Sequence, residues 1–543
     1  MKLHGLHKPK LLKRLKIGHA LWKSVKEFLL TTYVHSYHYL ADAEGGIPEK
    51  VMWLIVHFIT LFSAINIVTI AWGHFTDNPT ITTLESQHYS IYNLPFPALA
   101  ICSNNKLSNE SIYEYADYLY YKGFTKYDKE KLIKMIQYMG RLYDSEIEDF
   151  DDFTKFQEIL DTIDTDKKTG IFDSQAKLAM LAPKCDDILL KCKWGGALVN
   201  CSSFLQTRLT YEGFCCTFNY VRPSSDNETV VEAKAAAGVG PDMGLTILLN
   251  LSIADYAYTL KNFAGASAFI FDPYEFCDSS SGSVREVPLE RFVETRVTVT
   301  CVTKKAVEDV QRYSIEKREC LFPTDMMNEY NGNYVYGDCL TKCKLKSILA
   351  LCKCIPFNLP TNFPGIDTTL PFCSLSNLQC MNKYKIKWAT YKPREYIKVL
   401  EREMEDSINC VDCYPLCSST SYIVDSTSAK LNFFYQNKGS ILTGLNESND
   451  LSVLKVYFPE SDSVLYKTDV LYAWYDIISE YGGLLGLFLG CSIVTVFEII
   501  FFLTIRFYQN LFSSSNFMNK FQKHKPTMFD NKVLYRAKFD YIQ

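Results

Sequence analysis

A glycine, a cysteine and a serine interrupt the apolar run of residues 482–505, and the chemistry of this chain is concentrated there. Gly490-Cys491-Ser492 offers backbone carbonyls and a hydroxyl group, which are suitable ligands for a small, hard cation. The same run carries Glu498, and a carboxylate near the centre of a bilayer costs about 2.5–3.5 kcal/mol on insertion scales. Such a residue usually faces protein or water. We therefore interpret residues 482–505 as the wall of a polar path across a membrane.

The spacing of the tripeptide has a geometric consequence. In an unbroken helix at about 100° per residue, Gly490 and Ser492 would project about 200° apart and could not face one axis together. If both contact the same ion, the backbone must leave the helix there, which glycine permits. Non-helical backbone at membrane depth is tolerated only where it lines a cavity or is buried in protein.

Each of these features also has a simpler interpretation. The spacing of Gly482, Gly486 and Gly490 by four residues is equally typical of a stripe along which two helices pack closely. Glu498 could extend to the inner headgroups instead of lining a path. Cys491 is interpreted as a small side chain filling the middle position, not as a reactive thiol.

A second apolar run without charged side chains lies at residues 51–72, before a long hydrophilic region that separates it from the run at 482–505. Each run exceeds the ~20 residues that a membrane helix needs. Basic residues flank both runs on their outer sides, since residues 1–26 hold eight Lys or Arg and no Asp or Glu; we therefore expect both termini to be cytoplasmic. No cleavable signal peptide is expected. The predicted organisation is a basic arm at 1–50, a first membrane helix at 51–72, an outer domain at 73–476, a second membrane helix at 477–505 and a tail at 506–543.

Cysteines support an outer domain in an oxidising compartment. Eighteen of the 19 lie between Cys102 and Cys417, and an even number there is typical of a disulfide framework. Zinc is the competing interpretation of the pairs 352/354 and 410/413. The disulfide candidates are Cys102, Cys185, Cys192, Cys201, Cys215, Cys216, Cys277, Cys301, Cys320, Cys339, Cys343, Cys352, Cys354, Cys373, Cys380, Cys410, Cys413 and Cys417. The predicted N-glycosylation sites, all in the same region, are Asn109, Asn200, Asn227, Asn250 and Asn446.

The outer domain is predicted to mix helices with strands. Alternating apolar residues at 245–253 and 297–299 indicate half-buried strands. Residues 420–436 and 450–459 indicate two more strands. Helices are expected at Tyr127–Leu142 and Arg394–Ser407.

Five motifs, in this order, resemble the degenerin/epithelial sodium channel family, and within it the insect pickpocket branch. The match runs over nearly the whole chain. Residues 94–104 (LPFPALAICSN) resemble the family's opening strand, and residues 213–219 (GFCCTFN) its Gly-x-Cys-x-x-Phe-Asn element. The cysteine patterns at 339–356 and 410–417 are similar to its thumb framework. Residues 482–492 (GGLLGLFLGCS) are similar to its pore motif, which ends in Gly-x-Ser.

The resemblance implies a fold, an assembly and a function. The fold would be two membrane helices around a large disulfide-rich α/β ectodomain shaped like a hand, with palm strands, a helical finger and a thumb at 320–417. The chain would be a subunit of a homo- or heterotrimer in the plasma membrane, in contact with lipid. It would form a voltage-independent channel that conducts Na⁺, is blocked by amiloride-type compounds and is gated by an extracellular ligand, proton or force.

The same resemblance assigns roles to residues near the tripeptide. Gly490, Cys491 and Ser492 would form the selectivity filter. Ser479 falls at the degenerin position, where bulky side chains hold such channels open, and Glu480 and Glu498 match acidic positions flanking the pore. Other pore and gating candidates are Gly482, Gly483 and Gly486. No cofactor, metal or nucleic acid is implied.

One position departs from the family pattern. The family carries a His-Gly pair before the first membrane helix that affects gating, and here the matching pair is His35-Ser36. Serine lacks the freedom of glycine to adopt positive φ, so this subunit is expected to need partners for efficient gating.

Other functions fit the sequence less well. An ATP-gated trimeric channel would need a basic phosphate-binding pattern that we do not find. A two-span, scavenger-type receptor that conducts nothing would have no reason to keep Gly490, Ser492 and Glu498. An enzyme is not expected, because no metal, phosphate-loop or nucleophile-elbow motif is present. The sequence does not identify the stimulus, the disulfide pairing or the tissue.

Overall fold

The chain forms two compact units in a computed structural model. One comprises Met1–Pro79 with Val470–Gln543, and the other comprises Thr80–Asp469. The structure describes residues 8–32, 34, 37–41, 46–123, 127–147, 150–163, 172–223, 231–326, 334–367, 369–394, 399, 401–433, 441–443 and 450–512. We describe each unit by itself.

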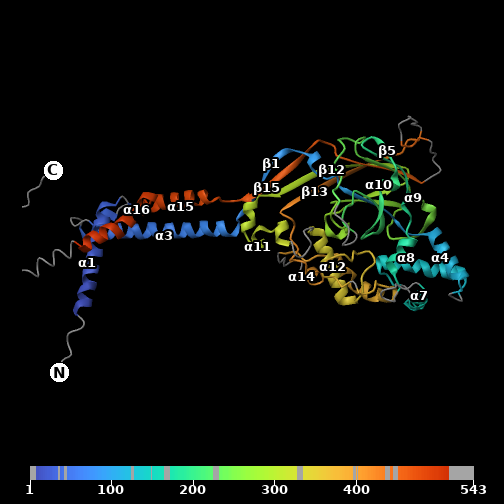
Figure 1. The fold of residues 1–543 in the computed structure, drawn as a ribbon, viewed down its shortest axis with the longest axis horizontal. Coiled ribbons are helices and arrows are strands. Elements are labelled where there is room, and N and C mark those ends of the chain that lie inside the picture. Colours follow the sequence, from blue (N-terminus) through green and yellow to red (C-terminus); the bar gives the residue numbers. More distant parts are fainter. Residues whose placement is uncertain are drawn as a thin grey trace, which may run out of the picture. The chain divides into compact units, whose positions relative to one another are not determined.

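Apart from Val470, the last residue of β15 (Asp462–Val470), the regular secondary structure of the first unit is helical in its described part. Figure 1 shows α3 and α15 side by side, and the rings of Trp72 and Tyr481 join them with centroids 6.4 Å apart. The ring of Phe75 lies 6.1 Å from that of Tyr472, which precedes α15. Pro48 lies in the first turn of α3, where its missing N–H costs no helical hydrogen bond. The helices are α1 (Lys8–Thr31), α2 (Tyr37–Ala41), α3 (Ile47–Asp77), α15 (Trp474–Leu489), α16 (Ile493–Phe501) and the π-helix η9 (Phe502–Arg506).

Two helical segments of this unit are long and apolar enough to cross a membrane, Ile47–Asp77 and Ile493–Phe512. The first extends beyond the expected 51–72 at both ends. The second begins only after the tripeptide, because the apolar run is divided there into α15 and α16. α16 continues through η9 to Phe512, so the second apolar region reaches beyond residue 505.

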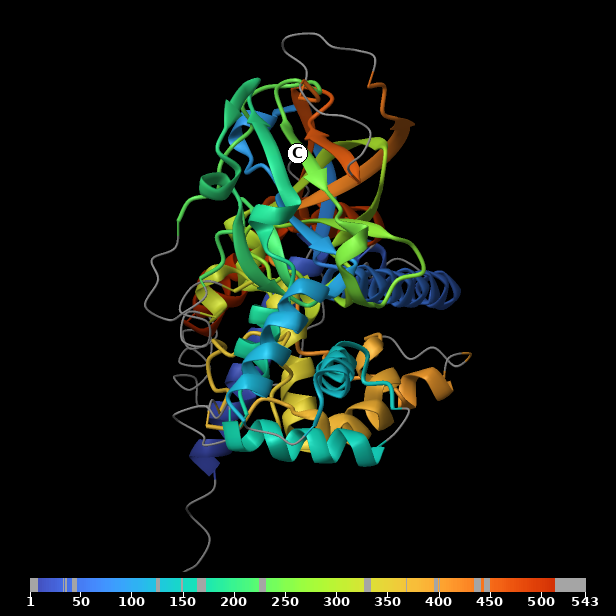
Figure 2. The same ribbon diagram turned by 90° about the vertical axis from the view of Figure 1, so that its right-hand side faces the viewer.

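The second unit combines strands with helices, and Figure 2 shows the strands gathered in one part and most of the longer helices in the other. Its largest sheet has the order β1-β15-β12-β14-β8-β4-β5, with β13 also paired to β12. The strands are β1 (Thr80–Ser90), β15 (Asp462–Val470), β12 (Val293–Ala306), β14 (Leu451–Tyr457), β8 (Leu245–Asn250), β4 (Leu189–Trp194), β5 (Ala197–Val199) and β13 (Ser418–Lys430).

A second sheet packs on the first through a shared apolar core, which includes Ile247, Val299 and Val456 from one sheet and Ile101 and Ile270 from the other. Its order is β11-β10-β2-β7-β6, and a separate pair joins β3 to β9. These strands are β11 (Arg285–Glu290), β10 (Gly265–Phe271), β2 (Ala98–Ser103), β7 (Gly213–Phe218), β6 (Gln206–Thr210), β3 (Asn105–Ser108) and β9 (Tyr256–Thr259).

The helices of this unit bury two further apolar clusters, one beneath α4, α5, α7 and α8 and one around α12. The helices are α4 (Asn109–Tyr121), α5 (Lys129–Gln137), α6 (Arg141–Asp144), α7 (Phe150–Ile163), α8 (Ser174–Leu181), α9 (Cys185–Ile188), α10 (Cys201–Phe204), α11 (Ile315–Arg318), α12 (Tyr336–Cys352), α13 (Leu378–Ala389) and α14 (Glu401–Glu405).

The sequence predicted most of these elements in kind. The alternating pattern of β12 is confirmed, since its buried and exposed residues alternate. β8 is buried on both faces instead of one, because Ile247 and Leu249 pack in the core between the two sheets and Leu248 packs with Ile441 on the opposite face. The helix expected at Tyr127–Leu142 is divided into α5, a 3₁₀ turn and α6. Of the helix expected at Arg394–Ser407, the described residues form only α14, and β15 was not predicted.

Eight disulfides staple the second unit. The pairs are Cys102–Cys215, Cys185–Cys216, Cys192–Cys201, Cys320–Cys417, Cys339–Cys413, Cys343–Cys410, Cys352–Cys380 and Cys354–Cys373. The zinc interpretation of 352/354 and 410/413 is therefore wrong, because all four sulfurs are bonded to other cysteines. The expectation that all eighteen cysteines pair is also wrong for Cys277 and Cys301, which are free and buried in different apolar clusters.

Candidate functional site

The backbone leaves the helix at the tripeptide. α15 ends at Leu489, and Gly490 adopts φ 68° and ψ 20°, a left-handed conformation that closes the helix. The N–H of Gly490 donates to the carbonyl of Gly486 at 2.9 Å, and that of Cys491 donates to Leu485 at 3.3 Å. The prediction that the helix breaks here is confirmed, and glycine is the residue that permits it without a Cβ clash.

Ser492 starts the next helix. Its side chain accepts a hydrogen bond from the N–H of Thr495 at 3.3 Å, while the Thr495 hydroxyl accepts from the N–H of Ser492 at 3.2 Å. This reciprocal pair satisfies two donors that a helix start leaves free. Thr495 is buried, so the cap has a defined orientation. The break is thus a short, ordered connection in which Gly490 caps the end of α15 and Ser492 caps the start of α16.

The other predicted pore residues lie on either side of this link. Ser479, Glu480, Gly482, Gly483 and Gly486 all belong to α15, and Glu498 belongs to α16. A Cβ atom added at Gly482 or Gly483 would meet nothing within 4 Å in the described chain. His35 and Ser36 lie outside the described residues.

A polar seam joins α1 to the end of the second apolar region, and the sequence did not predict it. Ser24, Glu27, Phe28 and Thr32 face Asn510, Arg506, Phe502 and Glu498, and we call these eight residues the inner seam. The order of contacts shows that the two segments run antiparallel. The four seam residues of the second apolar region (498, 502, 506 and 510) recur every four residues, which places them on one face of a helix. That spacing of polar and aromatic residues was the available sequence signal.

The contacts of the inner seam are specific. The Asn510 side-chain amide donates to Ser24 Oγ at 2.9 Å, and Arg506 Nε donates to Glu27 Oε2 at 2.8 Å. The Phe28 and Phe502 rings pack edge to face with centroids 5.6 Å apart.

Thr32 Oγ1 donates to Glu498 Oε2 at 3.2 Å. The Glu498 carboxylate therefore has a hydrogen-bond partner within the chain, which is what a carboxylate in an apolar run requires. Burial tends to raise the pKa of Glu27, but hydrogen bonds from Arg506 and Asn510 outweigh it, so the pKa lies below its usual value.

Three of the predicted glycosylation sites are described. Asn109 begins α4, Asn200 caps α10 by accepting from the N–H of Ser202, and Asn250 ends β8. Asn227 and Asn446 lie outside the described residues. Modification at these sites stays a prediction.

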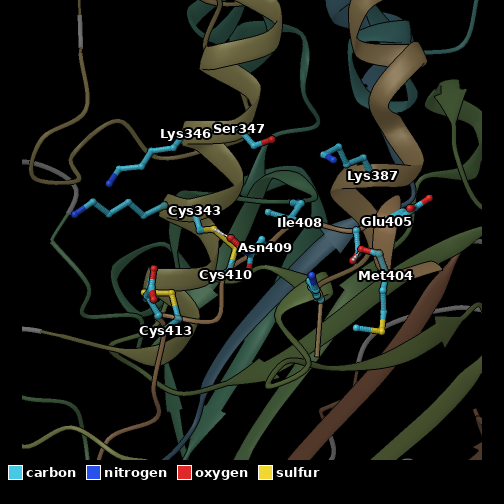
Figure 3. A pocket seen from close by; sticks show the side chains of 15 residues that line it. Cys343, Lys346, Ser347, Lys387, Met404, Glu405, Ile408, Asn409, Cys410 and Cys413 are labelled. Carbon is cyan, nitrogen blue, oxygen red and sulfur yellow. Dashed lines mark hydrogen bonds between the residues drawn. A yellow bond between two sulfur atoms is a disulfide. The ribbon is translucent and has the colours of Figure 1, made fainter. Parts of the chain in front are cut away.

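A pocket of about 750 Å³ lies among α12, α13, α14 and the segment that carries Cys410 and Cys413. Four lysines line it, from α12, α13 and the segment after α13, but Figure 3 shows the Lys346 side chain extending away from Lys387. The lysines therefore do not converge on one point. Within the described residues, no group of three or more His, Cys, Asp or Glu side chains could hold a metal ion.

The chain belongs to the amiloride-sensitive sodium channel family, whose model matches residues 28–502. It is 24% identical to Pickpocket protein 28 of Drosophila melanogaster, over 90% of this chain and 79% of that protein. It is 22% identical to Sodium channel protein Nach of Drosophila ananassae, over 90% of this chain and 87% of that protein. It is also 22% identical to the epithelial sodium channel subunit gamma of Xenopus laevis, over 60% of this chain and 46% of that protein.

Proposed function

We propose that this chain is a subunit of a sodium-selective channel of the plasma membrane, with Gly490, Cys491 and Ser492 as its selectivity filter. The observation that carries the proposal is the non-helical, doubly capped link at these residues within an apolar run. A simple lipid anchor has no use for such a break, because unpaired backbone groups cost several kcal/mol in hydrocarbon. Carbonyl and hydroxyl oxygens suit Na⁺.

The proposed number of subunits rests on the family resemblance, and the need for more than one subunit rests on the geometry of a single chain. One broken helix cannot enclose a path, so we propose that three copies, or this chain with related subunits, surround the pore. The described cysteine pairs support an outer location for residues 80–469. With two membrane segments, both termini would then be cytoplasmic. Amiloride block, voltage independence and gating by an extracellular stimulus are part of the proposal.

The inner seam has a mechanical role in this proposal. It ties α1 to the part of the second apolar region that follows the filter. We propose that movement of α1 is transmitted through Arg506 and Glu498 to the inner end of the path. Glu480 would lie at the opposite end of the same path and attract cations.

Electrical recording tests the proposal. Because the stimulus is unknown, the chain is expressed as Ser479→Phe, which places a bulky side chain at the degenerin position, alone and with related subunits. We expect an amiloride-sensitive current whose reversal potential follows external Na⁺. Adding Ser492→Leu should shift that potential toward K⁺. A surface-expressed protein that stays silent in every combination would instead favour a non-conducting receptor.

A further inference from the structure

A second cavity lies inside the unit formed by Thr80–Asp469, and its volume is about 730 Å³. Cavities of ~300–1,000 Å³ are typical of small-molecule sites. It lies among the end of β1, the end of β12, the start of β13, the start of α12 and the loop that follows β10. Much of its wall is aromatic, formed by Tyr89, Tyr274, Tyr334, Tyr336 and Phe363.

Two of the three carboxyl groups that line this cavity are already satisfied. Asp338 accepts from Arg222 Nε and from the N–H of Phe276, both at 2.7 Å. Glu275 is 4% exposed and accepts from the hydroxyl of Ser283 at 2.5 Å. Burial raises the pKa of Glu275 to about 8, so this carboxyl is mostly protonated at neutral pH and carries little charge.

Asp272 is different. The hydrogen bond that the structure shows for its carboxylate comes from the N–H of Tyr274, at 2.9 Å, and no ion pair to it is present in the described part of the chain. Burial raises the pKa of Asp272 to about 6, so it is ionised at neutral pH. Asp272 is half-buried, and an ionised carboxylate that has lost part of its hydration is stabilised when a cation faces it.

None of the cations that line the cavity forms an ion pair with Asp272 in the described part of the chain. Arg222 is held by Asp338 and by the side-chain oxygen of Asn362, at 3.1 Å. Lys305 Nζ donates to the hydroxyl of Tyr89 at 2.9 Å and lies over that ring. Lys304, the remaining cation of the lining, is exposed on β12. The site therefore offers a carboxylate that forms no ion pair in the described part of the chain, next to an aromatic wall, while the side chains of Lys304 and Lys305, which also line the cavity, are exposed to solvent.

We propose that this cavity binds a small organic cation, an ammonium group on an apolar body, with Asp272 as its counter-ion. Aromatic faces attract an ammonium group through their quadrupole, and they also cover the apolar part of a ligand. An anionic ligand of the same size would place its charge against Asp272. The proposal goes beyond channel activity, since binding at this cavity requires no current.

The test uses the full-length protein purified in detergent and titration calorimetry. The probe is 2-phenylethylamine, and its neutral counterpart is 2-phenylethanol, which has the same shape without the positive charge. We expect saturable binding of the amine, about tenfold or more tighter than that of the alcohol. Asp272→Asn should abolish this preference. Glu316→Gln, at an exposed carboxylate outside the cavity, should keep it.

The outcomes against the proposal are equally definite. Equal affinity for amine and alcohol, or no saturable binding of the amine up to about 10 mM, overturns it without any variant. An unchanged preference in Asp272→Asn overturns the role of that carboxylate. A silent channel that binds the amine would contradict the proposed function while leaving this inference intact.

Discussion

The two apolar regions of this chain have similar compositions but different backbones. α3 is an unbroken helix of 31 residues, although it contains Gly73 and several polar side chains. Thr60, Asn66 and Thr69 all donate to carbonyls of their own helix, three or four residues back. In the second region Ser492 accepts from a backbone N–H instead and so begins a new helix. Glycine and polar residues break an apolar helix only where they can close one helix and cap the next.

The largest expected effect is that of Gly490→Leu. A leucine at φ 68° is strained by about 1–2 kcal/mol, and removing the strain would extend α15 into the tripeptide. We expect loss of most of the Na⁺ current in the Ser479→Phe background, measured at equal surface expression. Gly73→Leu is the matched control, because Gly73 is helical and has open space around its Cβ position; it should conduct normally. If Gly490→Leu and Gly73→Leu lost the same fraction of the Na⁺ current, the conclusion that only the second apolar region needs a break in its helix would be wrong.

Chemical modification of Cys491 should have the next largest effect. If the tripeptide lines a watery path, a charged, membrane-impermeant thiol reagent will attach there and block most of the current. Cys491→Ser should conduct and resist the reagent. Ala64→Cys in that background places a thiol at a buried site of α3 and should also resist. Persistence of the Ser479→Phe current after complete labelling of Cys491 would contradict the pore assignment.

Ser492→Ala sharpens the comparison at the level of stability. Loss of a helix N-cap costs about 0.5–2 kcal/mol, so the midpoint of thermal unfolding should fall and selectivity for Na⁺ over K⁺ should weaken. Thr69→Ala removes only a hydrogen bond to its own helix and should change neither property. Thermal unfolding in detergent and reversal potentials measure the two effects. A selectivity identical to that of the parent would argue against Ser492 as a filter ligand.

The smallest effect is expected at the inner seam. The Glu27 and Arg506 side chains are 27% and 43% exposed, so their coupling should be only about 0.5 kcal/mol. Glu27→Gln, Arg506→Gln and the double variant form a double-mutant cycle that measures it by thermal unfolding. Strictly additive effects would show that the ion pair is not coupled.

How far the sequence predicts this structure depends on how local the determining interactions are. The break at Gly490–Ser492 followed from helix geometry, and the strands at β12, β13 and β14 followed from local patterns. The inner seam could not be predicted with the same ease, because its two halves are separated by more than 460 positions. The continuation of the helix beyond residue 505 was not evident from composition, because Arg506 and Asn510 are polar; in the structure both have partners on α1. Likewise, the even number of cysteines in the outer domain indicated that all of them pair. Cys277 and Cys301 stay free because they are buried in separate apolar clusters.

The two unpaired thiols bear on how the framework could assemble. Burial raises the pKa of Cys301 to about 12 and that of Cys277 well above its usual value. Thiol–disulfide exchange proceeds through the thiolate, which these residues scarcely form once β10 and β12 are covered. During oxidative folding in the secretory pathway, the packing of the two sheets would thus bury both thiols, and they would no longer react with the other cysteines. Burial in the apolar core would in this way prevent Cys277 and Cys301 from forming non-native disulfides.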